Sequence, residues 1–194
     1  MDELTDRSAP RRGRPPDPTL RPRLLATARR LLAEGGLQAL NADRLARAAG
    51  AGKSAVHRRW PDLLDLAADV VRTADLAKPA QGAAATVDDL AALAAGWSAP
   101  LSLPERAAAS LVGAHRHHAA LAEAFVGAVD TPLTELATTL LARRGPVDPA
   151  RASRVAQVLR ALLVGRLVRG PVSPAHADGL AREVLDPLLG RPGG

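Results

Sequence analysis

The chain of 194 residues contains no cysteine and no tyrosine, and aromatic residues make up only 2% of it. Without cysteine, neither disulfides nor thiolate metal sites can form. With so few aromatic side chains, the core has to be built from Leu, Ala and Val. Ala and Leu favour helices and runs of β-branched residues are few, so the composition predicts an all-α protein.

Long hydrophobic runs are also missing. The N-terminal segment MDELTDRSAP has no apolar signal core. The most apolar stretch, VLRALLVGRLV at residues 158–168, is too short to span a bilayer and contains two arginines. We therefore expect a soluble cytoplasmic protein that does not associate with a membrane.

The usual sequence marks of enzymes are absent as well. There is no P-loop, no dinucleotide-binding fingerprint, no Gly-x-Ser-x-Gly and no HExxH. Ser54 and His57 lie three residues apart, but no carboxylate nearby could orient the histidine as a base. The cluster HRHH at 115–118 has no carboxylate at metal-ligand spacing. We expect no enzymatic activity, no cofactor and no metal site.

Positive charge, in contrast, is concentrated in one part of the chain. Residues 1–60 contain 13 Lys and Arg against 6 Asp and Glu, whereas residues 61–194 contain 13 against 14. This asymmetry predicts a basic module that binds a polyanion, joined to a nearly neutral module with another role. A solvated basic face without a partner is the alternative interpretation.

Composition also suggests where the modules begin and end. Residues 1–16 are charged and proline-rich, which predicts a disordered basic arm. Within it, Arg12 and Arg14 belong to RRGRPP, which resembles the AT-hook core that enters the minor groove, although a plain basic tail would look similar. The small-residue segment AKPAQGAAAT at 77–86 predicts a linker. The predicted domains are therefore 17–76 and 77–194.

Four helices are predicted in the first domain. Asp17 and Pro18 are typical of a helix start, and Gly35 and Gly36 should end that helix after a stripe of leucines. A second helix should run from its N-cap Asn41 to Gly50, a short third helix should start near 53, and a fourth should span about 62–73. Two short helices joined by a glycine-containing turn indicate a helix-turn-helix.

The third predicted helix has an apolar side and a basic side. Val56 and Trp60 lie one turn apart and should point into the core. The opposite side should carry the residues that reach base edges in the major groove of DNA, while neighbouring polar residues hold phosphates. The predicted DNA contacts are Arg12, Arg14, Asn41, Arg44, Lys53, Ser54, His57, Arg58 and Arg59.

The second domain is predicted to be a bundle of six helices, separated by prolines and glycines, at about 86–97, 103–113, 116–130, 132–144, 149–169 and 174–189. Its few aromatic and histidine side chains, together with an arginine in an apolar run, are candidates for a ligand site: Trp97, His115, His118, Phe125 and Arg160. Arg166 also lies in an apolar run, where it could meet an anionic ligand or extend to solvent.

Residues 13–71 resemble the N-terminal domain of TetR/AcrR-type transcriptional regulators. The resemblance lies in LLAEGGLQAL, in the step from Gly50 to Lys53 and in HRRWP. It implies an all-α homodimer that binds a near-palindromic operator in double-stranded DNA. It further implies a repressor that releases DNA when a small molecule enters the C-terminal domain, with no enzymatic role.

Three positions depart from the family pattern. Ala55, His57 and Leu63 stand where the family usually has Thr, Tyr and Lys, which commonly contact phosphates. The phosphate contacts should therefore depend more on Arg58, Arg59 and the arginines of the N-terminal arm.

In this family the last two long helices would form the dimer interface. The apolar residues predicted for it are Val155, Leu159, Leu162, Leu163, Leu180, Val184 and Leu188. The same pattern would also arise from packing within one chain. For the whole protein, the alternative to a DNA-binding regulator is an all-α protein-interaction module with a basic tail and no sequence-specific DNA binding.

Overall fold

The computed structural model describes residues 17–76 and 89–190, and every regular element in these two ranges is helical. The predicted all-α class is therefore confirmed for this part of the protein. The predicted arm with Arg12 and Arg14 and the predicted linker at 77–86 lie outside the described residues. No helix in the two described ranges combines the length and apolar character needed to cross a bilayer.

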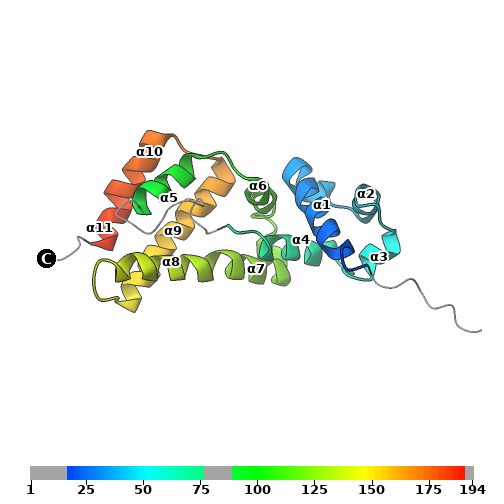
Figure 1. Cartoon of the computed structure of the whole chain (residues 1–194), viewed down its shortest axis with the longest axis horizontal. Coiled ribbons are helices and arrows are strands. Elements are labelled where there is room, and N and C mark those ends of the chain that lie inside the picture. The colour runs from blue at the N-terminus through cyan, green and yellow to red at the C-terminus, as the bar shows by residue number, and fades with distance from the viewer. Residues whose placement is uncertain (1–16, 77–88, 191–194) are drawn as a thin grey trace, which may run out of the picture.

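The helices form an elongated molecule, with α1, α2 and α3 at one end and α10 and α11 at the other (Figure 1). The first range contains α1 (Leu20–Gly35), α2 (Ala42–Ala48), α3 (Lys53–His57) and α4 (Leu63–Arg72). The second contains α5 (Asp89–Ser98), α6 (Leu103–Ala109), α7 (Ala119–Phe125), α8 (Thr131–Ala142), α9 (Pro149–Arg169), α10 (Pro174–Gly179) and α11 (Asp186–Leu189). Short 3₁₀ turns lie at Leu37–Ala39 and His115–His117.

The helix α1 starts slightly later than its sequence predicts. Asp17 does not cap it directly; its carboxylate accepts hydrogen bonds from the backbone and hydroxyl of Thr19 at 2.9 and 2.7 Å, and the helix begins at Leu20. The helix ends as expected, because Gly36 has a φ of +66° and its N–H donates to the carbonyl of Leu32. The predicted leucine stripe is buried, including Leu24, Leu25, Ala28, Leu31 and Leu32.

One proline that was predicted to separate two helices, Pro132, instead lies inside a continuous helix. A π turn, η3 (Val126–Asp130), joins α7 directly to α8, and Pro132 follows it. The predicted break between 130 and 132 is therefore wrong. One helix was predicted to end at 113 and the next to begin at 116, whereas α6 ends at Ala109 and α7 begins at Ala119.

The π turn explains how the helix accepts the proline. A proline ring clashes with the carbonyl four residues earlier, which for Pro132 is that of Ala128 in η3. In the π turn the N–H of Thr131 instead bonds the carbonyl of Val126, five residues back, so the local turn is wider. A second π turn, η4 (Leu180–Leu185), precedes Pro187 in the same way and joins α10 to α11.

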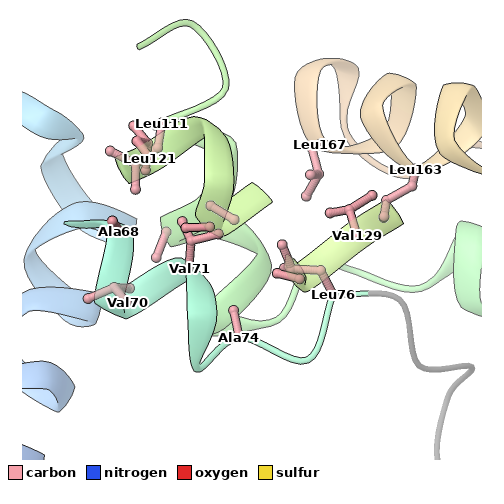
Figure 2. Close-up of a cluster of buried hydrophobic side chains, with 14 of the residues drawn as sticks. Ala68, Val70, Val71, Ala74, Leu76, Leu111, Leu121, Val129, Leu163 and Leu167 are labelled. Carbon is pink, nitrogen blue, oxygen red and sulfur yellow. The ribbon is translucent and has the colours of Figure 1, made fainter. Parts of the chain in front are cut away.

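One hydrophobic core runs through both described ranges. Helix α4 packs against α1 on one side and against α6 and α7 on the other, and α1 also packs against α6. Figure 2 shows Ala68 and Val71 of α4 in the same cluster as Leu111 and Leu121. The two predicted domains are thus joined by shared packing, because the fourth helix contributes to the core of each.

A buried arginine connects three elements of the C-terminal part. Arg166 of α9 is only 6% exposed, and its Nε donates to Glu105 of α6 at 3.1 Å. Its Nη1 donates to the carbonyls of Trp97 and Ala99, at 2.9 and 2.7 Å. Arg166 therefore holds α9 against α6 and the segment that joins α5 to α6, and it does not extend to solvent.

The carboxylate of Glu105 is ionised in this setting. Burial alone would raise the pKa of Glu105, but hydrogen bonds from the backbone N–H of Ser102 and from Arg166 outweigh it and bring the pKa below its ordinary value. Ser102 and Glu105 also form a capping box at the start of α6. The ion pair is consequently both charged and geometrically fixed at neutral pH.

We predict that Arg166→Met lowers the free energy of unfolding by about 3–5 kcal/mol, because it leaves the carboxylate of Glu105 and several buried carbonyls without their donors. Urea denaturation monitored by circular dichroism would measure the loss. The matched control is Arg182→Met, whose guanidinium is 78% exposed and pairs with Asp178 at 3.4 Å. It should change stability by less than about 1 kcal/mol. Equal losses of unfolding free energy in the two variants would contradict the conclusion that the buried contacts of Arg166 hold α9 against α6.

Candidate nucleic-acid interface

Helices α2 and α3 and the turn between them form the predicted helix-turn-helix. The side chain of Asn41 caps α2 by accepting a hydrogen bond from the backbone N–H of Arg44 at 2.8 Å. In the turn, Gly50 has a φ of +60°, a left-handed conformation that favours glycine. The N–H of Ala51 then bonds the carbonyl of Ala46 at 2.8 Å, as in a Schellman motif. Gly52 has an extended backbone that other residues can adopt.

The short helix α3 has the two sides that its sequence predicts. Val56 is 0% exposed and Trp60, just beyond the helix, is 4% exposed. On the other side Lys53, Ser54, His57 and Arg58 are all exposed. The apolar contacts therefore hold α3 against the domain while its polar side chains face away from the core.

Two of the predicted phosphate-binding side chains have partners within the chain. The Nζ of Lys53 lies 3.0 Å from a carboxylate oxygen of Asp43 on α2, and both side chains are more than half exposed. Such a surface pair contributes little free energy, so the ammonium group can exchange it for a phosphate at small cost. Arg59 donates from Nη1 to the carbonyl of Ala55 at 3.1 Å. Arg44 is exposed, and Asn41 keeps its amide donors available.

A carboxylate that the sequence analysis did not single out fixes the end of this helix. Asp69 of α4 accepts a hydrogen bond from the indole N–H of Trp60 at 3.0 Å. It also pairs with Arg21 of α1 at 2.8 Å and with Arg72 at 2.9 Å. Arg72 in turn donates to the carbonyl of Ala120 in α7 at 3.3 Å. The sequence did contain a signal for such a residue, because a buried indole N–H needs a hydrogen-bond acceptor.

The electrostatics of Asp69 follow from these contacts. Burial raises the pKa of this carboxyl, but hydrogen bonds from Trp60 and Arg72 and the charge of Arg21 outweigh burial and lower the pKa below its ordinary value. Because the pKa is lower in the folded chain than in the unfolded chain, the ionised carboxylate stabilises the fold at pH values above the ordinary pKa of a carboxyl group. That stabilisation is lost as the pH falls through the lowered value.

The five residues predicted to hold a ligand do not converge. Trp97 alone among them lines a cavity of about 450 Å³ in the C-terminal part. The ring of His115 packs edge-on against Phe125, with 5.5 Å between centroids. His118 lies 3.3 Å from Asp62, the N-cap of α4, and Arg160 pairs with Asp130 at 2.8 Å.

The cavity is formed by α5, α6, α8, α9 and the segment that follows α4. Sequence analysis missed most of its lining, because these residues come from five separate segments of the chain. Its lining residues are Asp75, Leu76, Ala92, Leu93, Gly96, Trp97, Ala99, Pro100, Ser102, Pro104, Glu105, Leu133, Leu136, Leu159, Leu163 and Arg166. Across 17–76 and 89–190, no three His, Asp or Glu side chains are grouped so that they could hold a metal ion.

The residues predicted for the dimer interface divide into two groups. Val155, Leu159 and Leu163 are 0%, 2% and 6% exposed and belong to the core of the single chain. Leu162, Leu180 and Leu188 are half-buried, and Val184 is exposed. Two exposed valines of α9 that were not predicted, Val164 and Val168, lie one turn apart on the outward side of that helix.

We predict that Asp69→Asn lowers the free energy of unfolding at pH 7 by about 1–3 kcal/mol, since it weakens charged hydrogen bonds to Trp60 and two arginines. The difference from the unmodified chain should shrink as the pH falls through the ordinary carboxyl range and then through the lowered pKa of Asp69, because the carboxylate is protonated first in the unfolded state and then in the folded state. Urea midpoints across this range would measure it. Asp65→Asn, one turn away on α4, controls for loss of one charge. A difference that stays constant with pH would contradict the role of the Asp69 charge.

Comparison with known proteins agrees with this geometry. Residues 24–70, which run from α1 to α4, match the family model of bacterial regulatory proteins of the tetR family. No curated protein sequence matches the chain significantly. Among solved structures, a TetR-family transcriptional regulator from Rhodococcus sp. is similar with a TM-score of 0.64 and 16% identity, covering 88% of this chain and 99% of that one.

A second similar structure is a transcriptional regulator from Rhodococcus sp. Rha1, with a TM-score of 0.58 and 21% identity over 87% of this chain and 93% of that one. At these identities the likeness shows a shared fold, which extends over both described ranges. The family model identifies the N-terminal domain. Residues 24–70 therefore carry the domain that the family model of bacterial regulatory proteins of the tetR family describes.

Proposed function

We propose that this protein is a sequence-specific DNA-binding transcriptional regulator that acts as a homodimeric repressor and leaves its operator when a small molecule binds the C-terminal domain. The observation that carries the proposal is the geometry of α3. Buried Val56 and Trp60 fix this helix, and its exposed side presents Lys53, Ser54 and Arg58 together. A helix presented in this way fits the major groove of B-DNA.

The proposed roles follow from side-chain chemistry. Arg58 suits the O6 and N7 acceptors of guanine, and Ser54 can donate to or accept from a base edge. Lys53, Arg44 and Arg59 are proposed to bind phosphates, which position the protein without specifying sequence. The N-terminal Arg12 and Arg14 are proposed to reach the minor groove beside the site.

The departures from the family pattern shift the phosphate contacts towards arginine. The side chains of Ala55 and Leu63 have no polar group to offer a phosphate. His57 is exposed and is proposed to contact the backbone of DNA as a hydrogen-bond donor. The stronger charge–phosphate contacts then fall to arginines, chiefly Arg59 just past the C-cap of α3, while Arg58 is proposed to read a base.

Residues 17–76 are proposed to be the DNA-binding domain and 77–194 the domain for ligand binding and dimerisation. The contacts of α4 support communication between them. Asp75 and Leu76, just past the end of α4, line the cavity, while Asp69 within α4 holds Trp60 and Arg21. A molecule in the cavity that moved this end of α4 would therefore act on the support of α3.

The proposed dimer interface uses the outward apolar side chains of α9 and of the α10–α11 helix. Val168 is 63% exposed and Val164 and Val184 are 38% and 37% exposed. Half-buried Leu162 and Leu180 add to this surface. Two copies related by a two-fold axis would cover the same surface on each other, as is usual for homodimers.

We predict that the purified full-length chain enriches a two-fold-symmetric motif from random double-stranded DNA at a stated salt concentration, and that its affinity falls steeply as salt rises. No enriched motif, together with little salt dependence, would refute the proposal and favour a protein-interaction module.

Arg58→Ala should weaken binding to the selected site by about 1–3 kcal/mol and relax the preference at one base pair, if Arg58 reads a base. Arg143→Ala, at the exposed C-cap of α8 and outside the proposed interfaces, is the control and should bind like the unmodified chain.

We predict that Val168→Asp converts the dimer into a monomer, because a carboxylate would have to be buried at the centre of an apolar contact. Sedimentation equilibrium would measure the mass. Val126→Asp is the matched control, since Val126 is 53% exposed but lies on η3, outside the proposed interface. Val168→Asp remaining dimeric, or both variants becoming monomeric, would argue against this interface.

A further inference from the structure

The cavity in the C-terminal part has apolar walls and one charged end. Its walls come from α5, α8 and α9, with Trp97, Leu136 and Leu163 among the side chains that face it. At its charged end lie Glu105 and Arg166. The volume of about 450 Å³ falls within the range of cavities that hold small organic molecules.

The arginine at the charged end already has its partners. Its Nε donates to Glu105, its Nη1 donates to the carbonyls of Trp97 and Ala99, and its Nη2 donates to the carbonyl of Pro100 at 3.5 Å. These bonds occupy four of the five N–H groups that a guanidinium offers. The charge of Arg166 is balanced by Glu105, so an incoming anion would have to displace a buried carboxylate to reach it.

The other polar side chains of the cavity do not favour an anion either. Asp75, the remaining ionisable group among the described lining residues, is also acidic. A carboxylate that entered would lose its hydration and would find no unused cation among the described side chains that line the cavity. An uncharged molecule loses little on entering and gains from burying its apolar surface against Trp97 and the leucines.

We propose that this cavity binds an uncharged, mainly apolar organic molecule and discriminates against carboxylates. The inference deepens the proposed ligand-released regulator, on which it rests for its biological meaning. The discrimination is set by the Arg166–Glu105 pair, which occupies the one cationic side chain among the described residues that line the cavity.

The test compares two probes of equal chain length, 8-bromooctan-1-ol and 8-bromooctanoate, titrated into the full-length chain without DNA at pH 7.5. Bromine quenches tryptophan on contact, and of the two tryptophans only Trp97 lines the cavity. The alcohol should quench with an affinity at least about tenfold higher than the carboxylate, which corresponds to about 1.4 kcal/mol. Equal affinities, or tighter binding of the carboxylate, would overturn the proposal.

Glu105→Gln tests the source of the discrimination. It removes the charge that balances Arg166, so binding of the carboxylate should improve by about tenfold while binding of the alcohol stays the same. Circular dichroism would establish that the variant is folded. An unchanged ratio between the two probes in a folded Glu105→Gln variant would show that the ion pair does not set the preference.

A second variant keeps the proposal falsifiable whatever the stability of Glu105→Gln. Gly96 lines the cavity from α5, and a Cβ built there meets no heavy atom within 4 Å. Gly96→Leu should fill the space and abolish saturable quenching by the alcohol. Ala95→Leu, on the exposed side of the same helix, should leave it intact. Persistent binding in Gly96→Leu would place the probe elsewhere and refute the site.

These outcomes are separate from those of the proposed function. If the chain binds the alcohol in the cavity but enriches no DNA motif, the proposed regulatory function is refuted and the proposed ligand preference stands. If the chain binds its operator but the cavity prefers the carboxylate, only the proposed ligand preference is refuted.

Discussion

The hydrogen bond from the indole of Trp60 to Asp69, at 3.0 Å, is the contact on which the exposed side of α3 depends. A helix of five residues cannot persist by itself, because the cost of nucleation exceeds what so few hydrogen bonds return. Tertiary contacts must hold it, and the buried side chains of Val56 and Trp60 provide them. Burial of the indole then requires an acceptor, and the half-buried carboxylate that provides it is balanced by the cations Arg21 and Arg72.

The same network connects the N-terminal helices to the C-terminal part. Arg72 extends it from α4 to the carbonyl of Ala120 on α7, and the apolar side of α4 belongs to a core that continues to α9. Figure 2 shows Leu76, just past α4, in the same cluster as Val129 and Leu163. Because tightly packed interiors do not deform continuously, a change at the cavity end of α4 would be passed to Asp69 as a shift of the whole helix.

Local signals in the sequence predicted the helix-turn-helix well, and long-range features escaped them. The cap at Asn41, the left-handed Gly50 and the buried Val56 each depend on residues a few positions away. The ion pair of Arg166 with Glu105 joins residues 61 positions apart, so no local pattern could reveal it. The helix through Pro132 was missed for another reason: proline signals a break, and only the fold shows that a π turn absorbs it.

The ionic clusters at Asp69, which is half-buried, and at Arg166, which is buried, have different consequences for what the protein can bind. A buried ion pair adds little net stability relative to apolar residues of the same volume, because desolvation offsets most of the attraction. Its effect is to fix geometry. At Asp69 one carboxylate gathers an indole and two guanidiniums from three segments, which positions a helix. At Arg166 one guanidinium is used up by a carboxylate and backbone carbonyls, which leaves a cavity wall that is polar but offers little to an anion.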